Sequence, residues 1–292
     1  MRVLVTGATG QLGSEVVRCL QQQGHEVTAP RRAEMDFLDP DAAAQKVDNL
    51  RPDWVINCAA WTQVDGAETE PEAAFVINRD SPGRLAESVA HLGGRMLHVS
   101  TDFVFDGRQD RPYREDDDPN PIGIYGRSKL AGEQVVQAAL PGVTLLRTAW
   151  VYGVHGHNFV KTIIRAAQAG KPLRVVADQV GSPTWARDIA GAITVLVGKE
   201  ASGLYHYTSA GSTSWHGFAT AILEEAARAG FELATDTIEP IPTSAWPTPA
   251  TRPAYSVLDT HKIREHLDAP IPDWRESLKS MLEELYACAD CW

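Results

Sequence analysis

The chain has 292 residues, of which 43% are hydrophobic and 22% charged, and its formal net charge is -11. This length suits one large domain or two moderate ones, and the apolar content is too high for a disordered chain. The acidic balance argues against nucleic-acid binding, because phosphate backbones are bound by surplus lysine and arginine. No apolar run approaches the ~20 residues that span a membrane, and the N-terminus lacks the apolar stretch of a signal peptide. We therefore expect a globular, cytoplasmic protein with no nucleic-acid or membrane partner.

Short β-branched segments alternate with helical patterns over the first half of the chain. The strands are expected at residues 2–5, 26–29, 54–59, 96–100 and 143–146. The helices are expected at residues 12–20, 40–50, 71–92 and 125–139. This alternation predicts an α/β fold: a Rossmann-like, doubly wound parallel sheet with helices on both faces and its ligand at the carboxyl ends of the strands.

Beyond Trp150, prolines interrupt the alternation. Further helices are expected near residues 159–169, 187–196, 215–229 and 274–285. We expect residues 1–150 to form a dinucleotide-binding domain. Residues 151–292 should form mainly a smaller, loop-rich substrate-binding domain, with some segments returning to the first domain and a cleft between the two.

Three glycines, Gly7, Gly10 and Gly13, follow the first expected strand and open the first expected helix. Gly7 permits a tight turn, Gly10 lets the backbone approach a pyrophosphate, and Gly13 allows the helix to pack closely on the strand. The helix N-terminus then offers free N–H groups and partial positive charge to the phosphates. This context predicts a dinucleotide cofactor.

The end of the second expected strand indicates which dinucleotide is bound. An acid there usually binds the ribose of NAD, but this chain has Ala29-Pro30-Arg31-Arg32. Arginine can hold the 2′-phosphate of NADP, so NADPH is favoured, with NADH as the alternative. Asp36 and Phe37, expected on a third strand, are candidates to bind and cover the adenine ring.

Tyr125 and Lys129 have the i, i+4 spacing that places both side chains on one helix face. Bringing the pKa of a tyrosine near ~7 takes about 4 kcal/mol, which a neighbouring ammonium and an oxidised nicotinamide ring can supply. The pair follows an expected strand that ends in Ser100-Thr101-Asp102, whose hydroxyls could reach the same substrate oxygen. Without that strand, the pair would be read as a surface contact.

The glycine turn, the hydroxyls after a middle strand and the Tyr-x-x-x-Lys pair together resemble the extended short-chain dehydrogenase/reductase superfamily. Within it, the chain is similar to the dTDP-4-dehydrorhamnose reductases over most of its length. The matching stretches are TGATGQLG (6–13), MDFLDP (35–40), NCAAWTQVDGAE (57–68), STDFVFDG (100–107), YREDDDPNPIGIYGRSKLAGE (113–133), RTAWVYG (147–153), DQVGSPT (178–184) and RPAYSVLD (252–259).

The resemblance implies roles for the matched residues. Tyr125 would be the proton donor, Lys129 its partner and a ligand of the nicotinamide ribose, and Thr101 would bond the keto oxygen. The cofactor would be lined by Gly7, Gly10, Gln11, Leu12, Gly13, Asp36, Phe37, Ala60, Trp61, Thr62, Val99, Tyr125 and Lys129. The sugar would be contacted by Thr101, Asp102 and Trp150, and Arg252 is our candidate clamp on the nucleotide phosphates.

Two residues depart from the family pattern. Phe103 stands where the reductases often have tyrosine, and Trp61 where histidine is frequent. Both keep an aromatic face but lose a polar contact, which leaves the substrate preference open. The related sugar-nucleotide 4,6-dehydratases have an acid at the position of Phe103. Since phenylalanine cannot move a proton, dehydration is disfavoured.

We predict no metal. Some family members hold magnesium through glutamates at a dimer contact, and Glu15 matches one of them, but the sequence shows no convincing partners for it. Cys288-x-x-Cys291 is typical of half a zinc site or a redox pair, and no second pair completes it. His155 and His157 flank a glycine in an expected loop and lack further ligands.

The resemblance implies NAD(P)H-dependent reduction of the C4 ketone of a nucleotide-activated 6-deoxy sugar, most simply dTDP-4-dehydro-L-rhamnose to dTDP-L-rhamnose. Two alternatives stay open. One is another sugar-nucleotide ketoreductase or epimerase of the superfamily. The other is a non-catalytic regulatory subunit, because a relative of these reductases binds methionine adenosyltransferase. A homodimer is compatible with the sequence, which does not fix the oligomeric state.

Overall fold

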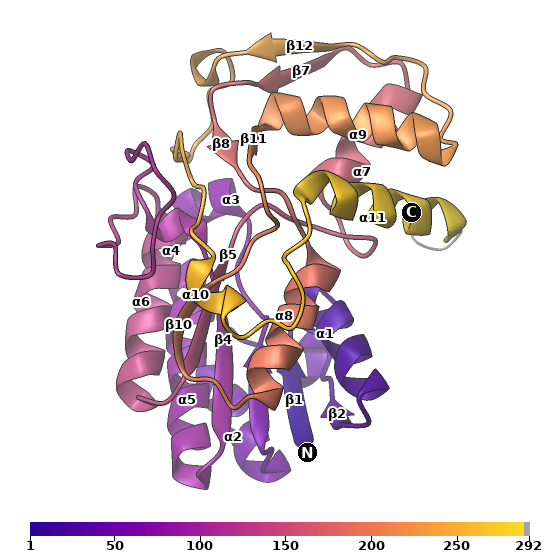
Figure 1. Cartoon of the computed structure of the whole chain (residues 1–292). Helices are drawn as coiled ribbons and strands as arrows, with labels where there is room; N and C mark the ends of the chain where they lie inside the picture. Colours follow the sequence, from indigo (N-terminus) through magenta and orange to yellow (C-terminus); the bar gives the residue numbers. More distant parts are fainter. Residues whose placement is uncertain (289–292) are drawn as a thin grey trace.

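A computed structural model of the chain describes residues 1–288 and contains a six-stranded parallel sheet (Figure 1). Its strands are β1 (Arg2–Thr6), β2 (Glu26–Thr28), β3 (Trp54–Asn57), β4 (Arg95–Thr101), β5 (Thr144–Thr148) and β10 (Gly203–His206). They lie in the order β10-β5-β4-β3-β1-β2, and every pair is parallel. The chain turns first from β1 to β2 and then returns to β3 on the other side of β1. This reversal leaves a crevice at the carboxyl ends of the strands, where doubly wound sheets bind ligands.

Helices cover both faces of the sheet because neighbouring residues of a strand point to opposite sides. Val3 and Val5 pack with helices α1 (Gln11–Gln22) and α8 (Ala186–Gly198), whereas Leu4 packs on the opposite face. The opposite face is covered by α2 (Pro40–Leu50), α5 (Ser81–Leu92) and α6 (Ile124–Ala139). These two layers confirm the predicted fold class.

The segment Met35–Phe37 is not the strand that we predicted. It follows the short 3-10 helix η1 (Arg32–Glu34) and turns: Leu38 N donates to the carboxylate of Asp36 at 3.0 Å, and Asp39 N donates to the Asp36 carbonyl at 3.2 Å. A carboxylate that bonds its own backbone two residues on favours a turn over an extended strand.

The single helix predicted over residues 71–92 is interrupted. The chain forms α3 (Val64–Thr69), α4 (Pro71–Phe75), a π-helical turn η2 (Val76–Asp80) and then α5. Pro82 lies in the first turn of α5 and has no N–H to donate to the carbonyl four residues earlier. The register of the helical hydrogen bonds therefore changes before the proline, and the π-helical turn η2 accommodates this change.

After residue 150 the chain builds most of a second layer above the sheet, in the upper part of Figure 1. Its elements are β6 (Val151–Tyr152), α7 (Phe159–Gln168), β7 (Leu173–Val176), β8 (Val180–Gly181), β9 (Thr184–Trp185), β11 (Thr213–Ser214), α9 (Trp215–Ala229), β12 (Ile238–Ile241), η4 (Thr243–Ala245) and α11 (Trp274–Ala287). The short helix α10 (His261–Arg264) packs beside β10 instead. Helices α7, α9 and α11 enclose an apolar core of their own. The intervening α8 and β10 return to the sheet. The predicted division at residue 150 stays a prediction.

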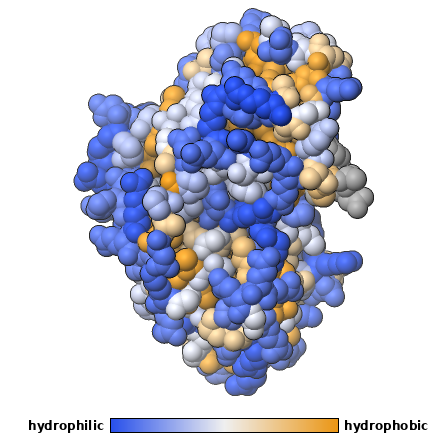
Figure 2. Space-filling view, turned by 45° about the vertical axis from the view of Figure 1, so that its right-hand side comes forward, coloured by the Kyte–Doolittle hydropathy of each residue, from blue (hydrophilic) through white to orange (hydrophobic). Residues whose placement is uncertain are grey.

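Figure 2 shows that hydrophilic residues cover most of one face and that apolar residues gather in small areas between them. Across residues 1–288, no helix has both the length and the apolar composition that crossing a membrane requires.

Candidate active site

A cavity of about 980 Å³ lies at the carboxyl ends of the central strands, between the sheet and the elements above it. It brings together every predicted site residue except Trp61. These lining residues are Gly7, Gly10, Gln11, Leu12, Gly13, Asp36, Phe37, Ala60, Thr62, Val99, Thr101, Asp102, Tyr125, Lys129, Trp150 and Arg252.

The glycine turn between β1 and α1 has the geometry of a phosphate-binding turn. Gly7 has φ +65°, and a Cβ there would lie 2.7 Å from the backbone nitrogen of Ala59. A Cβ on Gly13 would lie 2.2 Å from the Gly7 carbonyl oxygen. The first helical bond runs from Ser14 N to Gly10 O at 3.1 Å, so the preceding N–H groups of the first turn are available to an anion. This part of the cavity fits a dinucleotide.

The far end of the same cavity is lined by the segment that we predicted to bind adenine. Phe37 is buried, and its carbonyl accepts a hydrogen bond of 2.6 Å from Ser81. Arg32 lines the cavity 3.8 Å from Asp36, and its side chain is 74% exposed, so it can turn toward a phosphate. Arg31 is not among the residues that line the cavity.

The predicted acid–base residues lie where β4 ends and α6 begins. Thr101 is the last residue of β4, and Tyr125 is in the first turn of α6, one turn before Lys129. Lys129 Nζ donates to the carbonyl of Val99 on β4 at 2.6 Å. The ring of Phe103 meets that of Tyr125 edge-on, with centroids 5.5 Å apart. The hydroxyl of Thr101, the phenol of Tyr125 and the ammonium of Lys129 thus line one cavity. Phe103 lies beside them and has no proton to transfer.

Burial dominates the electrostatics of this group. It raises the pKa of Tyr125 to about 12, with a contribution from the charge of Asp102 that a hydrogen bond with Thr101 opposes. Burial also raises the pKa of Asp102 to about 6 and lowers the pKa of Lys129 to about 8, against the attraction of Glu133. Without a cofactor, desolvation of the phenolate outweighs the polar contacts of Tyr125. The lowering of the tyrosine pKa by an oxidised nicotinamide ring stays a prediction.

Asn78 ties the loop after β3 to the catalytic helix. Its side-chain oxygen accepts from Trp61 N at 2.8 Å, and its amide nitrogen donates to Trp61 O at 3.1 Å and to Ser128 Oγ at 2.9 Å. The indole N–H of Trp61 donates to the carbonyl of Gln63, and the side chain does not line the cavity. Asn78, on the π-helical turn, was missed because a buried asparagine within an apolar helix pattern has no sequence signal of its own.

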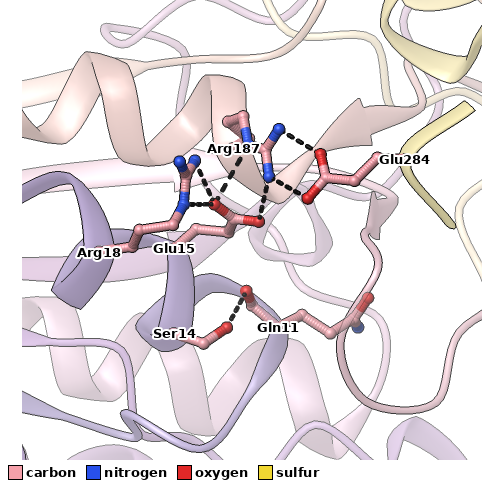
Figure 3. Close-up of polar contacts among 6 residues, drawn as sticks. All are labelled: Gln11, Ser14, Glu15, Arg18, Arg187 and Glu284. Carbon is pink, nitrogen blue, oxygen red and sulfur yellow. Dashed lines mark hydrogen bonds and ion pairs between the residues drawn. The ribbon is translucent and has the colours of Figure 1, made fainter. Parts of the chain in front are cut away.

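The carboxylate of Glu15, the residue that matches a metal-binding glutamate of the family, is engaged by two arginines. Its buried carboxylate accepts hydrogen bonds from Arg18 at 2.7 and 2.9 Å and from Arg187 at 3.3 Å, and Arg187 also pairs with Glu284 (Figure 3). Burial by itself raises the pKa of Glu15, but the two guanidinium groups bring it below its usual value. Within residues 1–288, no three His, Cys, Asp or Glu side chains are placed to hold a metal ion. The Cys288-x-x-Cys291 prediction lies partly outside the described residues.

Arg252 lines the upper side of the cavity but is already engaged. Its guanidinium pairs with Asp65 at 2.8 Å and donates to Thr248 and to the carbonyl of Ala250. Within residues 1–288, these contacts use three of its five N–H groups.

Several aromatic and polar residues of the upper side were missed by the sequence reasoning. They are His157, Asn158, Phe159, Trp215 and Phe218. The sequence singles out no tryptophan after residue 150 as a site residue, and for His157 it indicates only a loop. Nothing in the local sequence distinguishes these roles, because the cavity forms only when α7 and α9 meet the end of β5.

The comparisons with known proteins agree with this geometry. The family model described as "RmlD substrate binding domain" matches residues 1–287. The chain is 43% identical to a dTDP-4-dehydrorhamnose reductase of Burkholderia thailandensis, over 98% of this chain and 99% of that protein. It is 41% identical to a probable dTDP-4,6-dihydroxy-2-methyloxan-3-one 4-ketoreductase of Streptomyces antibioticus, over 98% and 96%.

A solved structure of dTDP-4-dehydrorhamnose reductase from Bacillus anthracis, in complex with NADP, superposes with a TM-score of 0.91 at 36% identity. The match covers 97% of this chain and 99% of that one. With a family model over nearly the whole sequence and relatives above 40% identity over nearly their whole length, the chain belongs to the RmlD substrate-binding-domain family of dTDP-4-dehydrorhamnose reductase relatives.

Proposed function

We propose that this protein uses NADPH to reduce the C4 ketone of a nucleotide-activated 6-deoxy sugar, with dTDP-4-dehydro-L-rhamnose as the substrate and dTDP-L-rhamnose as the product. The observation that carries the proposal is the convergence of Thr101, Tyr125 and Lys129 in the same cavity as the glycine turn. The names of the curated relatives support the substrate, and the NADP complex of a relative supports the cofactor.

The chemistry divides between the cofactor and the side chains. NADPH supplies a hydride to C4 when bound. Tyr125 gives its phenolic proton to the developing alkoxide, and the raised pKa keeps that proton in place at neutral pH until it is needed. Thr101 holds the ketone oxygen, and Lys129 stabilises the phenolate that the transfer leaves behind. One hydride and one proton thus convert the ketone to an alcohol.

The glycine turn supports binding of the cofactor pyrophosphate through backbone N–H groups, which need no cationic side chain. This explains how a chain with a net charge of -11 can bind two anionic ligands, since phosphates are held locally. Arg32 is the side chain in the cavity that we assign to the 2′-phosphate. NADH stays the alternative cofactor. We also keep a homodimer and a cytoplasmic location as predictions from the sequence.

A second candidate is reduction of a different 4-keto deoxysugar, which the 41% identity to the Streptomyces ketoreductase favours. Phe103 in place of a tyrosine is the feature of this cavity that bears on that choice.

The decisive experiment is a panel of dTDP-4-keto sugars with NADPH or NADH, followed by the absorbance of the reduced nicotinamide and by NMR of the product. We expect stoichiometric oxidation of NADPH and an equatorial alcohol at C4, the configuration of L-rhamnose. An epimerase would change the sugar without net oxidation. A regulatory subunit would oxidise neither cofactor with any sugar, and either result would refute the proposal.

A further inference from the structure

Two tryptophans from distant parts of the chain are stacked in the wall of the cavity. The ring centroids of Trp150 and Trp215 lie 3.6 Å apart with an interplanar angle of 6°, and both residues line the cavity. The ring of Phe159 packs edge-on against Trp215, with centroids 4.7 Å apart. Aromatic contacts of this kind stabilise beyond the area that they bury. The three rings therefore form one aromatic wall.

The backbone of Trp150 is strained. Its φ is +49°, in the left-handed region that a bulky residue occupies only at a cost in free energy. Trp150 follows the end of β5, and its carbonyl accepts from Thr184 N at 3.2 Å, which anchors the peptide on one side. Such a conformation persists when contacts with the surrounding residues stabilise it by more than the free energy that the backbone strain costs.

Gly181 and Trp215 are the surroundings that hold the Trp150 ring. A Cβ on Gly181 would lie 2.4 Å from Cε2 and 2.5 Å from Nε1 of Trp150, so no larger residue fits unless the indole moves. Gly181 is paired with Thr213 in the two-stranded β8–β11 ladder, and Trp215 follows directly after β11. The ladder thus places Gly181 and Trp215 against the same side chain, the indole of Trp150.

We propose that Trp215 is a positioning residue for binding of the sugar nucleotide. By stacking on Trp150, it holds the aromatic wall in its binding conformation before the ligand arrives. Gly181 leaves the space that the stacked rings need. The identity of the ligand rests on the proposed function, whereas the stacking does not. Fixing a binding group in advance improves affinity, because the group then loses little conformational entropy when the ligand binds. Trp215 acts through Trp150, so the proposal concerns binding and not the proton or hydride transfer.

The test compares Trp215→Phe and Gly181→Ala, which disturb the stack from opposite sides. The matched control is Trp246→Phe, because Trp246 is 54% exposed and does not line the cavity. Three readouts are measured: the dissociation constant of dTDP-L-rhamnose by calorimetry, the dissociation constant of NADPH, and the indole N–H resonance of Trp150 in protein labelled with ¹⁵N-tryptophan. Because the two rings are stacked, that resonance should carry a ring-current shift from Trp215. The signal that disappears in Trp150→Phe is assigned to Trp150.

We expect both test variants to move the Trp150 resonance and to weaken dTDP-L-rhamnose binding by about two- to tenfold, the range that one aromatic contact corresponds to. NADPH affinity should stay as in the wild type, and the control should match the wild type in all three readouts. Unchanged sugar-nucleotide affinity after a shifted resonance would overturn the proposal, as would an equal loss of NADPH affinity. These are binding measurements, so a wild type that binds dTDP-L-rhamnose but reduces no sugar would refute the proposed function alone.

Discussion

The two sides of the cavity are built in different ways. On the lower side, Tyr125 and Lys129 come from one turn of a long helix that packs on the sheet beside β4. On the upper side, Trp150, Trp215 and Arg252 come from three segments far apart in the sequence, joined by strands of two residues and by side-chain contacts.

This difference separates chemistry from recognition. The reacting groups are fixed by the backbone hydrogen bonds of regular elements, so their relative positions tolerate change elsewhere. The residues that we assign to the sugar nucleotide depend on side-chain packing, so they can vary without loss of the fold. Variants of the lower side should therefore change kcat, and variants of the upper side should change KM.

The largest effect is expected from Tyr125→Phe. Removal of the proton donor should lower kcat by about 10²–10⁴-fold, the usual contribution of a positioned general acid. Cofactor binding should survive, because the phenyl ring keeps its edge contact with Phe103. Steady-state kinetics and NADPH titration measure both quantities. Unchanged turnover would refute the assignment of chemistry to the lower side.

The pH dependence of activity should report Lys129. Burial lowers its pKa to about 8, so the ammonium is present below that pH and is lost above it, and kcat/KM should fall about tenfold per pH unit on the basic side. Lys129→Arg is the matched control, because a guanidinium does not titrate in this range. The variant should lose the basic limb even if its maximal rate is lower. A basic limb that is retained in the variant would show that another group titrates.

Arg252→Ala should raise KM for the sugar nucleotide by about tenfold, with little change in kcat, if Arg252 binds the phosphates. Asp65→Asn sharpens this test, since it removes the carboxylate that pairs with the guanidinium. If Arg252 clamps the ligand, Asp65→Asn should leave KM unchanged or lower it. If the ion pair only joins two parts of the chain, both variants should raise KM alike.

The smallest effect is expected from Glu15→Gln, because Glu15 does not line the cavity. Loss of its charge beside Arg18 and Arg187 should lower the free energy of unfolding by about 1–2 kcal/mol. This loss is smaller than for a fully buried ion pair, because solvent screens the two partly exposed arginines. Urea unfolding measures this. The Tm of the wild type should not respond to magnesium or to a chelator. A magnesium-dependent rise in Tm that Glu15→Gln abolishes would show that the carboxylate binds metal after all.

The sequence reasoning recovered most of the regular structure because the signals are local. Helix α2 forms over the predicted residues 40–50, where the Asp39 side chain accepts a hydrogen bond from Ala42 N at 3.0 Å and Pro40 occupies the first turn. Helix α9 has the predicted bounds, residues 215–229, because its apolar spacing and its Ser214 N-cap lie in one stretch. The strand that we predicted at Asp36 failed because a side-chain turn competes with β pairing, which apolar character alone does not reveal.

The sequence by itself determined the alternation that forms the sheet, the glycine turn and the helix that carries Tyr125 and Lys129, because each depends on residues a few positions apart. Only the tertiary structure decided that β10 completes the sheet, that Arg187 pairs with Glu15, and that Trp215 stacks on Trp150. These contacts join residues that lie tens of positions or more apart. Their partners are selected by how helices and short ladders pack, and no local pattern encodes that choice.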